Sequence, residues 1–275
     1  MSSANGASNG AAAAAATAPA KCLIVNADDF GLSDGVNDGI IEAHERGIVT
    51  STSLMVHQGA AEAAAAYGRR RPALSVGLHV DLGEWSADEH GKWEPVYQPV
   101  DTNDPRAVRE EIVSQVTRFR KLMGSNPTHL DSHQHAHKHG PANPVLLAAG
   151  RKLGVPVRHF SRSVRYCGDF YGQGIGGKPL HERITPDALI GLLAGLPAGI
   201  TEMCCHPGAD DRLSSRYLTE RRQELAALTD DRVRRAVREH GITLCSFANA
   251  PLNGRRRPVR PRWPAALRTL LFAGG

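Results

Sequence analysis

Short apolar runs alternate with amphipathic stretches along most of the chain, and this alternation predicts strands and helices in turn. The run Cys22–Asn26 is apolar until its last residue, which is typical of a strand buried on both faces. Residues 35–46 follow with apolar positions at helical spacing, a Ser-Asp pair suited to capping before them and Gly47 after them. The same pattern predicts seven strands, at residues 22–26, 49–56, 74–80, 128–131, 155–160, 200–205 and 242–247. Helices are predicted at residues 35–46, 60–67, 105–123, 144–153, 186–193 and 218–240.

Strict strand–helix alternation implies parallel strands joined by right-handed crossovers. We therefore predict an α/β fold, a distorted (β/α) barrel with about seven parallel strands in a single domain. An open doubly wound sheet is the alternative. The sequence contains neither a G-x-G-x-x-G motif nor a phosphate-binding P-loop, so no nucleotide motif supports that alternative.

Three segments do not follow the alternation. Residues 1–20 are an Ala-rich leader that we expect to be disordered, and residues 251–275 are a basic tail rich in Pro and Arg. Residues 81–104 form a long insertion within the fold. The folded domain is therefore expected to span residues 21–250.

The formal net charge of +5 comes largely from the tail, which holds six arginines and no acidic residue. The rest of the chain is close to neutral, so we expect no nucleic-acid partner. The tail could contact an anionic surface or be simply solvated. No apolar run approaches the ~20 residues of a membrane helix, and the leader carries no Lys or Arg, unlike a secretory signal.

The five cysteines favour reduced thiols. Four of them lie in apolar, strand-like runs, where cysteine behaves as a small hydrophobic residue, and there is no C-x-x-C motif. We therefore expect a cytoplasmic protein.

Candidate chemistry is concentrated in the run T-H-L-D-S-H-Q-H-A-H-K-H, residues 128–139. Five of the protein's 13 histidines lie there, together with Asp131. Imidazole and carboxylate ligands together suit a divalent metal ion. The run follows a proline and a short predicted strand, whereas solvated histidine runs usually lie in low-complexity tails, so we favour a metal or catalytic site.

Polar residues also end several of the predicted strands. Asp28 and Asp29 follow the first strand, His79 lies near the end of the third, and His133 and His206 come just after two later strands. Each has a structural explanation on its own, as a buried histidine or a helix cap. In a parallel barrel, however, the carboxyl ends of the strands meet at one mouth. We therefore expect these five side chains to converge.

The residue types suggest a division of roles. Asp29, His79 and His133 would supply three metal ligands, and a three-ligand site with an open position is typical of catalysis. Asp28 is then free to act as general base on a water molecule. His206 would protonate a leaving amine, so the set suits hydrolysis of an amide or ester.

Four motifs in order resemble the YdjC-like family of carbohydrate deacetylases, in particular the chitooligosaccharide deacetylases. They are V-N-A-D-D-F-G-L-S, G-L-H-V-D-L, P-T-H-L-D-S-H-Q-H-A-H and E-M-C-C-H-P-G, and the resemblance covers roughly residues 22–247. It implies a distorted (β/α) barrel that removes the N-acetyl group of an amino sugar with a divalent metal. The family's metal ligands correspond to Asp29, His79 and His133, and its base to Asp28.

The metal ion and some of the residue roles have more than one explanation. The family is usually described with Mg²⁺, whereas two imidazoles favour Zn²⁺, so both ions are retained. His135 and His137 could orient the ligands. Trp85, Trp93 and Tyr97, in the insertion, could stack on a sugar ring or simply pack the loop. The alternatives are hydrolysis of a non-sugar acyl or phosphoester substrate, and a non-catalytic carbohydrate-binding protein. A homodimer is compatible with the sequence.

Overall fold

The structure is a computed structural model that describes residues 20–87, 92–174, 177–209, 213, 215 and 217–252. Its main sheet has seven strands, and every pair of neighbours is parallel. The strands are β1 (Lys21–Phe30), β2 (Ser51–Leu54), β3 (Ser75–Val80), β6 (Leu130–Ser132), β7 (Val164–Cys167), β8 (Gly199–Cys205) and β9 (Ile242–Cys245). The helices are α1 (Asp34–Glu45), α2 (Ala61–Arg70), α3 (Pro105–Met123), α4 (Ala142–Leu153), α5 (Pro186–Ala194), α6 (Leu218–Thr229) and α7 (Asp231–Glu239), with short 3₁₀ turns η1 (His133–Lys138) and η3 (His181–Ile184).

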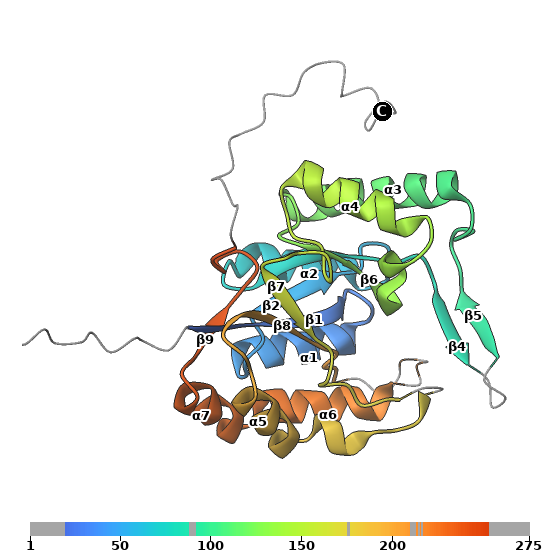
Figure 1. The fold of residues 1–275 in the computed structure, drawn as a ribbon. Helices are drawn as coiled ribbons and strands as arrows, with labels where there is room; N and C mark the ends of the chain where they lie inside the picture. The colour runs from blue at the N-terminus through green and yellow to red at the C-terminus, as the bar shows by residue number, and fades with distance from the viewer. Residues whose placement is uncertain are drawn as a thin grey trace, which may run out of the picture.

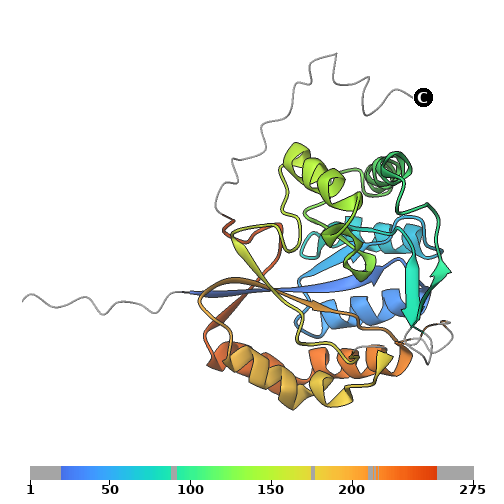
Figure 2. The same cartoon turned by 45° about the vertical axis from the view of Figure 1, so that its right-hand side comes forward.

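The strands wind around the sheet in the order of the chain, as in a barrel. The sheet order is β6-β3-β2-β1-β8-β7, so β1, β2, β3 and β6 follow one another on one side, and β7 and β8 return to β1 on the other. A doubly wound sheet would reverse its order at a switch point beside the first strand. The curled sheet, with helices around it, is clear in Figures 1 and 2. The prediction of a distorted barrel with seven parallel strands in one domain is confirmed.

The barrel is incomplete between β6 and β7. A strand was expected at residues 155–160, and this was wrong: only Val157 makes a parallel bridge, to Leu130. His159 adopts a left-handed backbone conformation (φ 67°), which interrupts the extended chain before β7 begins at Val164. The short bridge next to β6 nonetheless brings Arg158 toward the centre of the barrel.

Strand β1 separates two environments. Leu23, Val25 and Ala27 belong to the large core, whereas Cys22 and Ile24 belong to a smaller cluster with Cys245 and Phe247. Because side chains alternate along a strand, Asn26 and Asp28 continue the side of Cys22 and Ile24. That side therefore changes from apolar to polar toward the carboxyl end of the strand.

One expectation about cysteines was wrong. Cys22 and Cys245 form a disulfide, with Cα atoms 5.9 Å apart, while Cys167, Cys204 and Cys205 are free thiols. β9 pairs with the first half of β1, at Lys21–Ile24, and β2 pairs with its second half. The two cysteines are 223 residues apart in sequence, so only this pairing brings them together. The disulfide removes the cysteine argument for a cytoplasmic location.

A single helix was expected at residues 218–240, and this was also wrong. Asp230 ends α6 and caps α7, where its side chain accepts a hydrogen bond from the backbone N–H of Arg232 (2.7 Å). An aspartate at such a position competes with helix continuation by binding the next free backbone N–H group. The other helices follow the prediction closely, and of the Ser-Asp pair expected to cap α1 it is Ser33 that does so.

The insertion at residues 81–104 carries a separate two-stranded antiparallel sheet, β4 (Glu84–Ala87) and β5 (Trp93–Tyr97). It extends beyond the carboxyl ends of the barrel strands (Figure 1). The leader up to residue 19 and the tail from residue 253 lie outside the described residues. No helix in the described part of the chain is both long and apolar enough to cross a membrane.

Candidate metal centre and its surroundings

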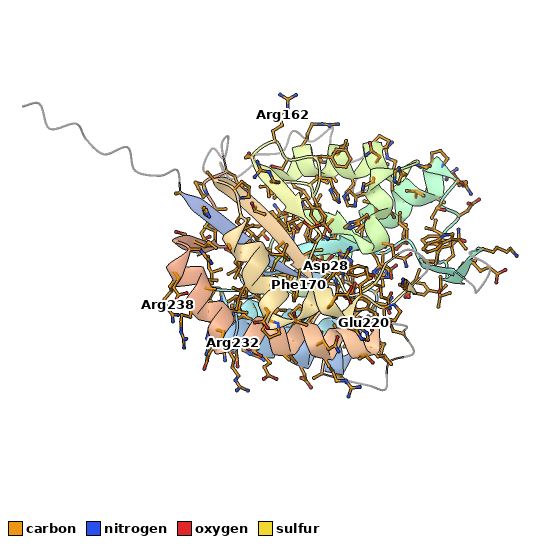
Figure 3. The ribbon with its side chains drawn as sticks, turned by 60° about the horizontal axis from the view of Figure 1, so that its bottom comes forward. Asp28, Arg162, Phe170, Glu220, Arg232 and Arg238 are labelled. Atoms are coloured by element: carbon orange, nitrogen blue, oxygen red, sulfur yellow. A yellow bond between two sulfur atoms is a disulfide. The ribbon has the colours of Figure 1, made fainter. Side chains whose placement is uncertain are left out.

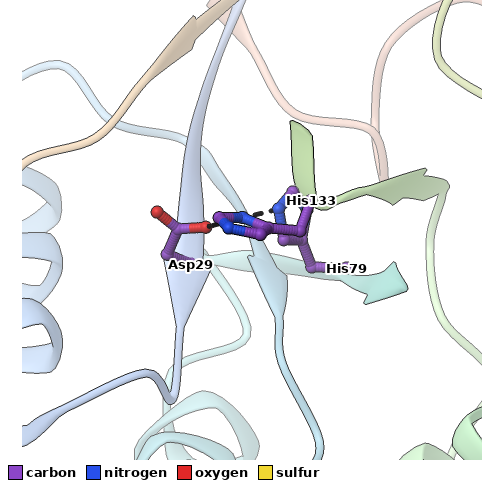
Figure 4. Close-up of side chains that lie close together, drawn as sticks. All are labelled: Asp29, His79 and His133. Carbon is purple, nitrogen blue, oxygen red and sulfur yellow. Dashed lines mark hydrogen bonds and ion pairs between the residues drawn. The ribbon is translucent and has the colours of Figure 1, made fainter. Parts of the chain in front are cut away.

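The expected side chains converge at the carboxyl ends of the strands. One carboxylate oxygen of Asp29, Oδ1, lies 3.1 Å from Nδ1 of His133 and 3.3 Å from Nε2 of His79 (Figure 4). Nε2 of His206 lies 3.8 Å from Oδ2 of Asp28. The structure thus brings together all five residues that end the predicted strands. Together, Asp28, Asp29, His79, His133 and His206 form the candidate metal centre.

Asp28 and Asp29 are adjacent in β1, yet both reach the centre. Neighbouring residues of a regular strand point to opposite faces. Here the register with β2 shifts between Ala27 and Phe30, and Asp29 has a left-handed backbone (φ 69°). A bulge of this kind re-aims a side chain beside a functional site, so both carboxylates face the mouth.

Ligand atoms of Asp29, His79 and His133 all lie within 4.8 Å of one another, close enough to hold one metal ion. Nδ1 of His79 donates to the carboxylate of Asp131 (2.8 Å), which leaves its Nε2 facing Asp29. Nε2 of His133 is buried without a hydrogen-bond partner among the described residues, and the carboxylate of Glu84 is 3.7 Å away. One carboxylate and two imidazoles whose ligand atoms lie this close together fit a divalent cation.

The charges of this group support the fit. Burial opposes protonation of His79, but Asp131 and Asp29 outweigh it and raise its pKa to about 10. Burial likewise opposes protonation of His133, and Asp29 raises its pKa to about 9. Burial would raise the pKa of Asp29, but Arg221 and His133 hold it well below its usual range. These carboxylates therefore stabilise a positive charge between them, whether a proton or a divalent cation carries it.

Arg158 lies between three buried carboxylates and was not singled out from the sequence. Its guanidinium donates to both oxygens of Asp28 (2.6 and 2.7 Å) and to Glu202 (2.7 Å), and it lies 3.0 Å from Asp131. Burial alone would raise the pKa of Asp28, but Arg158 lowers it, so the carboxylate is charged. A glutamate inside the apolar strand I-T-E-M-C-C was the available signal, because buried charges need partners.

His206 lies against helix α6 on the other side of Asp28. Its backbone N–H donates to the carboxylate of Glu224, and its ring Nδ1 lies 3.9 Å from the same carboxylate. Burial lowers the pKa of His206 to about 4 and raises that of Glu224 to about 8. At neutral pH the imidazole is therefore neutral and Glu224 holds a proton. Glu224 and Arg221 were not foreseen, since α6 carries many exposed charges in the same stretch.

His135 and His137 lie outside the group of Asp29, His79 and His133 and contact residues around it. The ring of His137 contacts the hydroxyl of Ser132 (2.6 Å) and the backbone oxygen of Arg158 (3.2 Å). Nε2 of His135 contacts the hydroxyl of Tyr166 (3.1 Å). These contacts support the loop after β6 and the backbone of Arg158.

Non-glycine residues with a left-handed backbone gather around this centre. They are Asp29, Gln134, His135 and His159, with φ between 47° and 69°. Such conformations are costly for residues with a Cβ atom and tend to persist at functional sites. All four of those found in the described residues lie at or beside the centre.

The aromatic candidates differ in position. Trp85 is tied to η1, because Gln134 forms hydrogen bonds with both its backbone N–H and its backbone oxygen. Trp93 is 60% exposed on β5. An aromatic residue not singled out from sequence, Tyr171, lies edge-on to His206 with ring centroids 5.4 Å apart, stacks on Tyr217 and is 37% exposed. Its neighbour in sequence, Phe170, is fully buried and is labelled in Figure 3.

Fold and centre together define an α/β protein of the distorted (β/α)-barrel class with a candidate metal site at the carboxyl ends of its strands. A solved CE4 esterase from Streptococcus mutans shares the fold, with a TM-score of 0.51, 13% identity, and coverage of 82% of this chain and 85% of the other. The chain belongs to the YdjC-like protein family, whose profile matches residues 22–239.

The match to this chain covers almost the whole length of two named relatives. A chitooligosaccharide deacetylase from Serratia marcescens is 34% identical, with 82% of this chain and 98% of the relative covered. A carbohydrate deacetylase from Geobacillus stearothermophilus is 35% identical, with 82% and 96% covered. A solved Enterococcus faecalis protein, provisionally described as a cellobiose-phosphate cleavage protein, is 29% identical with a TM-score of 0.68, covering 83% of this chain and 98% of its own.

Proposed function

We propose that the protein is a metal-dependent deacetylase that hydrolyses the N-acetyl group of an acetylated amino sugar, such as a chitooligosaccharide, and releases acetate. The observation that carries this proposal is the charged carboxylate of Asp28 beside the group Asp29, His79 and His133. Relatives named as carbohydrate deacetylases over nearly their whole length support the substrate class.

Asp29, His79 and His133 would hold the cation. A divalent ion bound there supplies Lewis-acid polarisation of the amide carbonyl and lowers the pKa of water. The two imidazoles favour Zn²⁺ or a similar transition ion, whereas Mg²⁺ prefers oxygen ligands, so the two ions are to be compared directly.

Asp28 and His206 would move the proton. Asp28 accepts a proton from water as the water oxygen bonds to the acetyl carbon. The neutral imidazole of His206, with Nε2 3.8 Å from Oδ2 of Asp28, can pass that proton to the sugar nitrogen as the C–N bond breaks. The products are acetate and the free amino sugar. Neutrality of His206 before the reaction suits this relay, because it must first receive the proton that it donates.

Hydrolysis of a phosphoester is less well supported. A phosphate site needs cationic groups that are free to bind it. Arg158 binds the carboxylates of Asp28 and Glu202, and Arg221 binds that of Asp29. Both arginines that contact the carboxylates of the centre are therefore already neutralised.

The decisive experiment measures acetate released from N,N′-diacetylchitobiose and other N-acetylated sugars by the full-length protein. Protein stripped with a chelator is compared with protein reloaded with Mg²⁺ or Zn²⁺. We expect acetate release that stops on chelation and returns with one of the ions. No acetate from any of the sugars, in protein that holds metal, would reject the proposal and favour another acyl substrate. The homodimer stays a prediction, which light scattering of the same preparation checks.

A further inference from the structure

Helix α6 presents two buried charged residues to the centre from outside the sheet. Arg221 is 4% exposed to solvent and Glu224 is 0% exposed. Tyr217 lies four residues before Arg221, and Glu224 three residues after it, so the three side chains share one face of the helix. Charged residues are almost never fully buried unless they are paired. Their partners therefore indicate what this face of α6 is for.

Arg221 divides the two oxygens of Asp29 between separate partners. Its Nη2 donates to Oδ2 at 2.6 Å. The other oxygen, Oδ1, is the one that faces Nδ1 of His133 and Nε2 of His79. The side chain of Asp29 is 2% exposed and that of Arg221 5%, so water does not screen the pair.

The same guanidinium also reaches the residue proposed to carry the proton. Nη1 of Arg221 donates to the backbone oxygen of His206 (3.3 Å), while Glu224 accepts from its backbone N–H. The backbone N–H of Gly208 in turn donates to the backbone oxygen of Arg221 (3.2 Å). A Cβ at Gly208 would lie 3.0 Å from Cδ of Arg221, so the loop after His206 packs directly on this side chain.

We propose that Arg221 is a positioning residue that restricts Asp29 to a single ligand oxygen and fixes His206 relative to the same centre. The proposal rests on the metal site of the proposed function. A free carboxylate can bind a cation through both oxygens, which would fill a coordination position that the substrate or water needs. A guanidinium suits this task because its donors lie in a rigid plane, with one directed at Asp29 and another at His206.

This arrangement has a cost that makes it testable. A full positive charge against the outer oxygen of a metal ligand opposes cation binding. A residue kept only for stability would leave the coordination of the cation unchanged when replaced. Removal of Arg221 should instead alter the ligand count and raise affinity together.

The experiment loads metal-free protein with Co²⁺ and records both its dissociation constant and its visible absorption, which weakens as the ion gains ligands. In Arg221→Gln we expect weaker absorption per bound ion and, because a neighbouring charge is lost, about tenfold tighter binding. In Arg221→Lys, which keeps the charge but not the planar pair of donors, we expect the spectral change without the tighter binding. Arg222→Gln, on the exposed side of the same helix, is the matched control and should leave both unchanged.

Wild-type spectra in both Arg221 variants would overturn the assignment of Arg221. If Arg221→Gln does not fold, as judged by circular dichroism, the spectrum of Arg221→Lys decides alone. Failure of the wild-type protein to bind Co²⁺ at all would instead count against the metal site in the proposed function. The two failures are therefore distinguishable.

Discussion

Asp28 and Arg158 form a buried two-point ion pair, with each carboxylate oxygen receiving its own N–H group at 2.6 and 2.7 Å. Asn26 adds a third donor, to Oδ1 of Asp28 at 2.8 Å. The carboxylate is thus held in one orientation with its charge retained. This orientation turns Oδ2 toward His206, and it follows from donors on two separate parts of the chain, β1 and the segment before β7.

Replacement of Arg158 should destabilise the fold strongly. In Arg158→Met the carboxylates of Asp28, Asp131 and Glu202 lose a shared buried partner, and loss of one member of a buried pair costs about 3–5 kcal/mol. Urea denaturation at pH 7 measures the free energy of unfolding. Arg162→Met, at a labelled arginine on the outside of the molecule (Figure 3), should change it by less than about 0.5 kcal/mol. Equal effects of the two substitutions would contradict this account.

Asp28→Asn should separate catalysis from metal binding. Loss of the base should reduce kcat by about 10²- to 10⁴-fold, because proton transfer by a positioned group contributes that much. The variant should still bind one metal ion, since Asp29, His79 and His133 remain. Acetate release and metal content are measured on the same sample. Full activity in this variant would remove the base assignment.

Substitution of Tyr171 and substitution of Trp93 should have different effects on KM, depending on which of the two rings the sugar stacks on. If the sugar ring stacks on Tyr171, beside His206, Tyr171→Ala should raise KM by about tenfold, which corresponds to about 1.4 kcal/mol of lost stacking. Trp93→Ala would then have little effect on short substrates, because that ring lies out on the β4–β5 hairpin. The reverse pattern would return the role to the tryptophan of the insertion. KM is compared for N-acetylglucosamine and its di- and trimer.

Glu224 should make stability depend on pH. Burial raises its pKa from 4.5 to about 8 in the folded protein, so the folded state holds a proton that the unfolded state releases above pH 4.5. Its contribution to stability is complete below pH 4.5 and is lost as pH rises toward 8, by at most about 1.4 kcal/mol per pH unit. Glu224→Gln should flatten that part of the profile. An unchanged slope in chemical denaturation from pH 5 to 8 would show that Glu224 does not titrate there.

The Cys22–Cys245 disulfide should stabilise the protein without affecting the chemistry. It joins β1 to β9 at the start of β1, whereas Asp28 and Asp29 of the candidate site lie toward the other end of that strand. Reduction, or the variant Cys245→Ser, should lower the free energy of unfolding by about 2–4 kcal/mol. Activity of the folded protein should be retained. Cys167→Ser, at a free and partly exposed cysteine, serves as the control.

Much of the fold and the convergence of the site residues could be predicted from the sequence. Buried parallel strands give continuous apolar runs, and polar residues at their ends, such as Asp28 and His79, must meet at one edge. Those signals are local. The strand predicted around Val157 failed because the run is apolar, yet His159 turns the backbone away after one bridge.

The partners of the site residues could not be predicted in the same way. Arg158 and Arg221 are single basic residues whose aspartate partners in β1, Asp28 and Asp29, lie 130 and 192 positions away in sequence. The disulfide depends likewise on which edge of β1 the last strand joins. Pairings of this kind are set by the three-dimensional arrangement of the strands, and no spacing along the chain encodes them.

The β4–β5 hairpin is a separate small sheet inserted between β3 and α3, with both of its ends on the same side of the barrel. Its hydrogen bonds to η1 involve backbone groups of Trp85, which any residue other than proline at that position could provide, but the carboxylate of Glu84 in β4 also lies 3.7 Å from Nε2 of His133. Exchange of the hairpin beyond Glu84 should therefore leave the buried carboxylates and histidines in place. Natural or engineered variation confined to this hairpin could change which glycan is bound, while the residues proposed to carry out the hydrolysis stay the same.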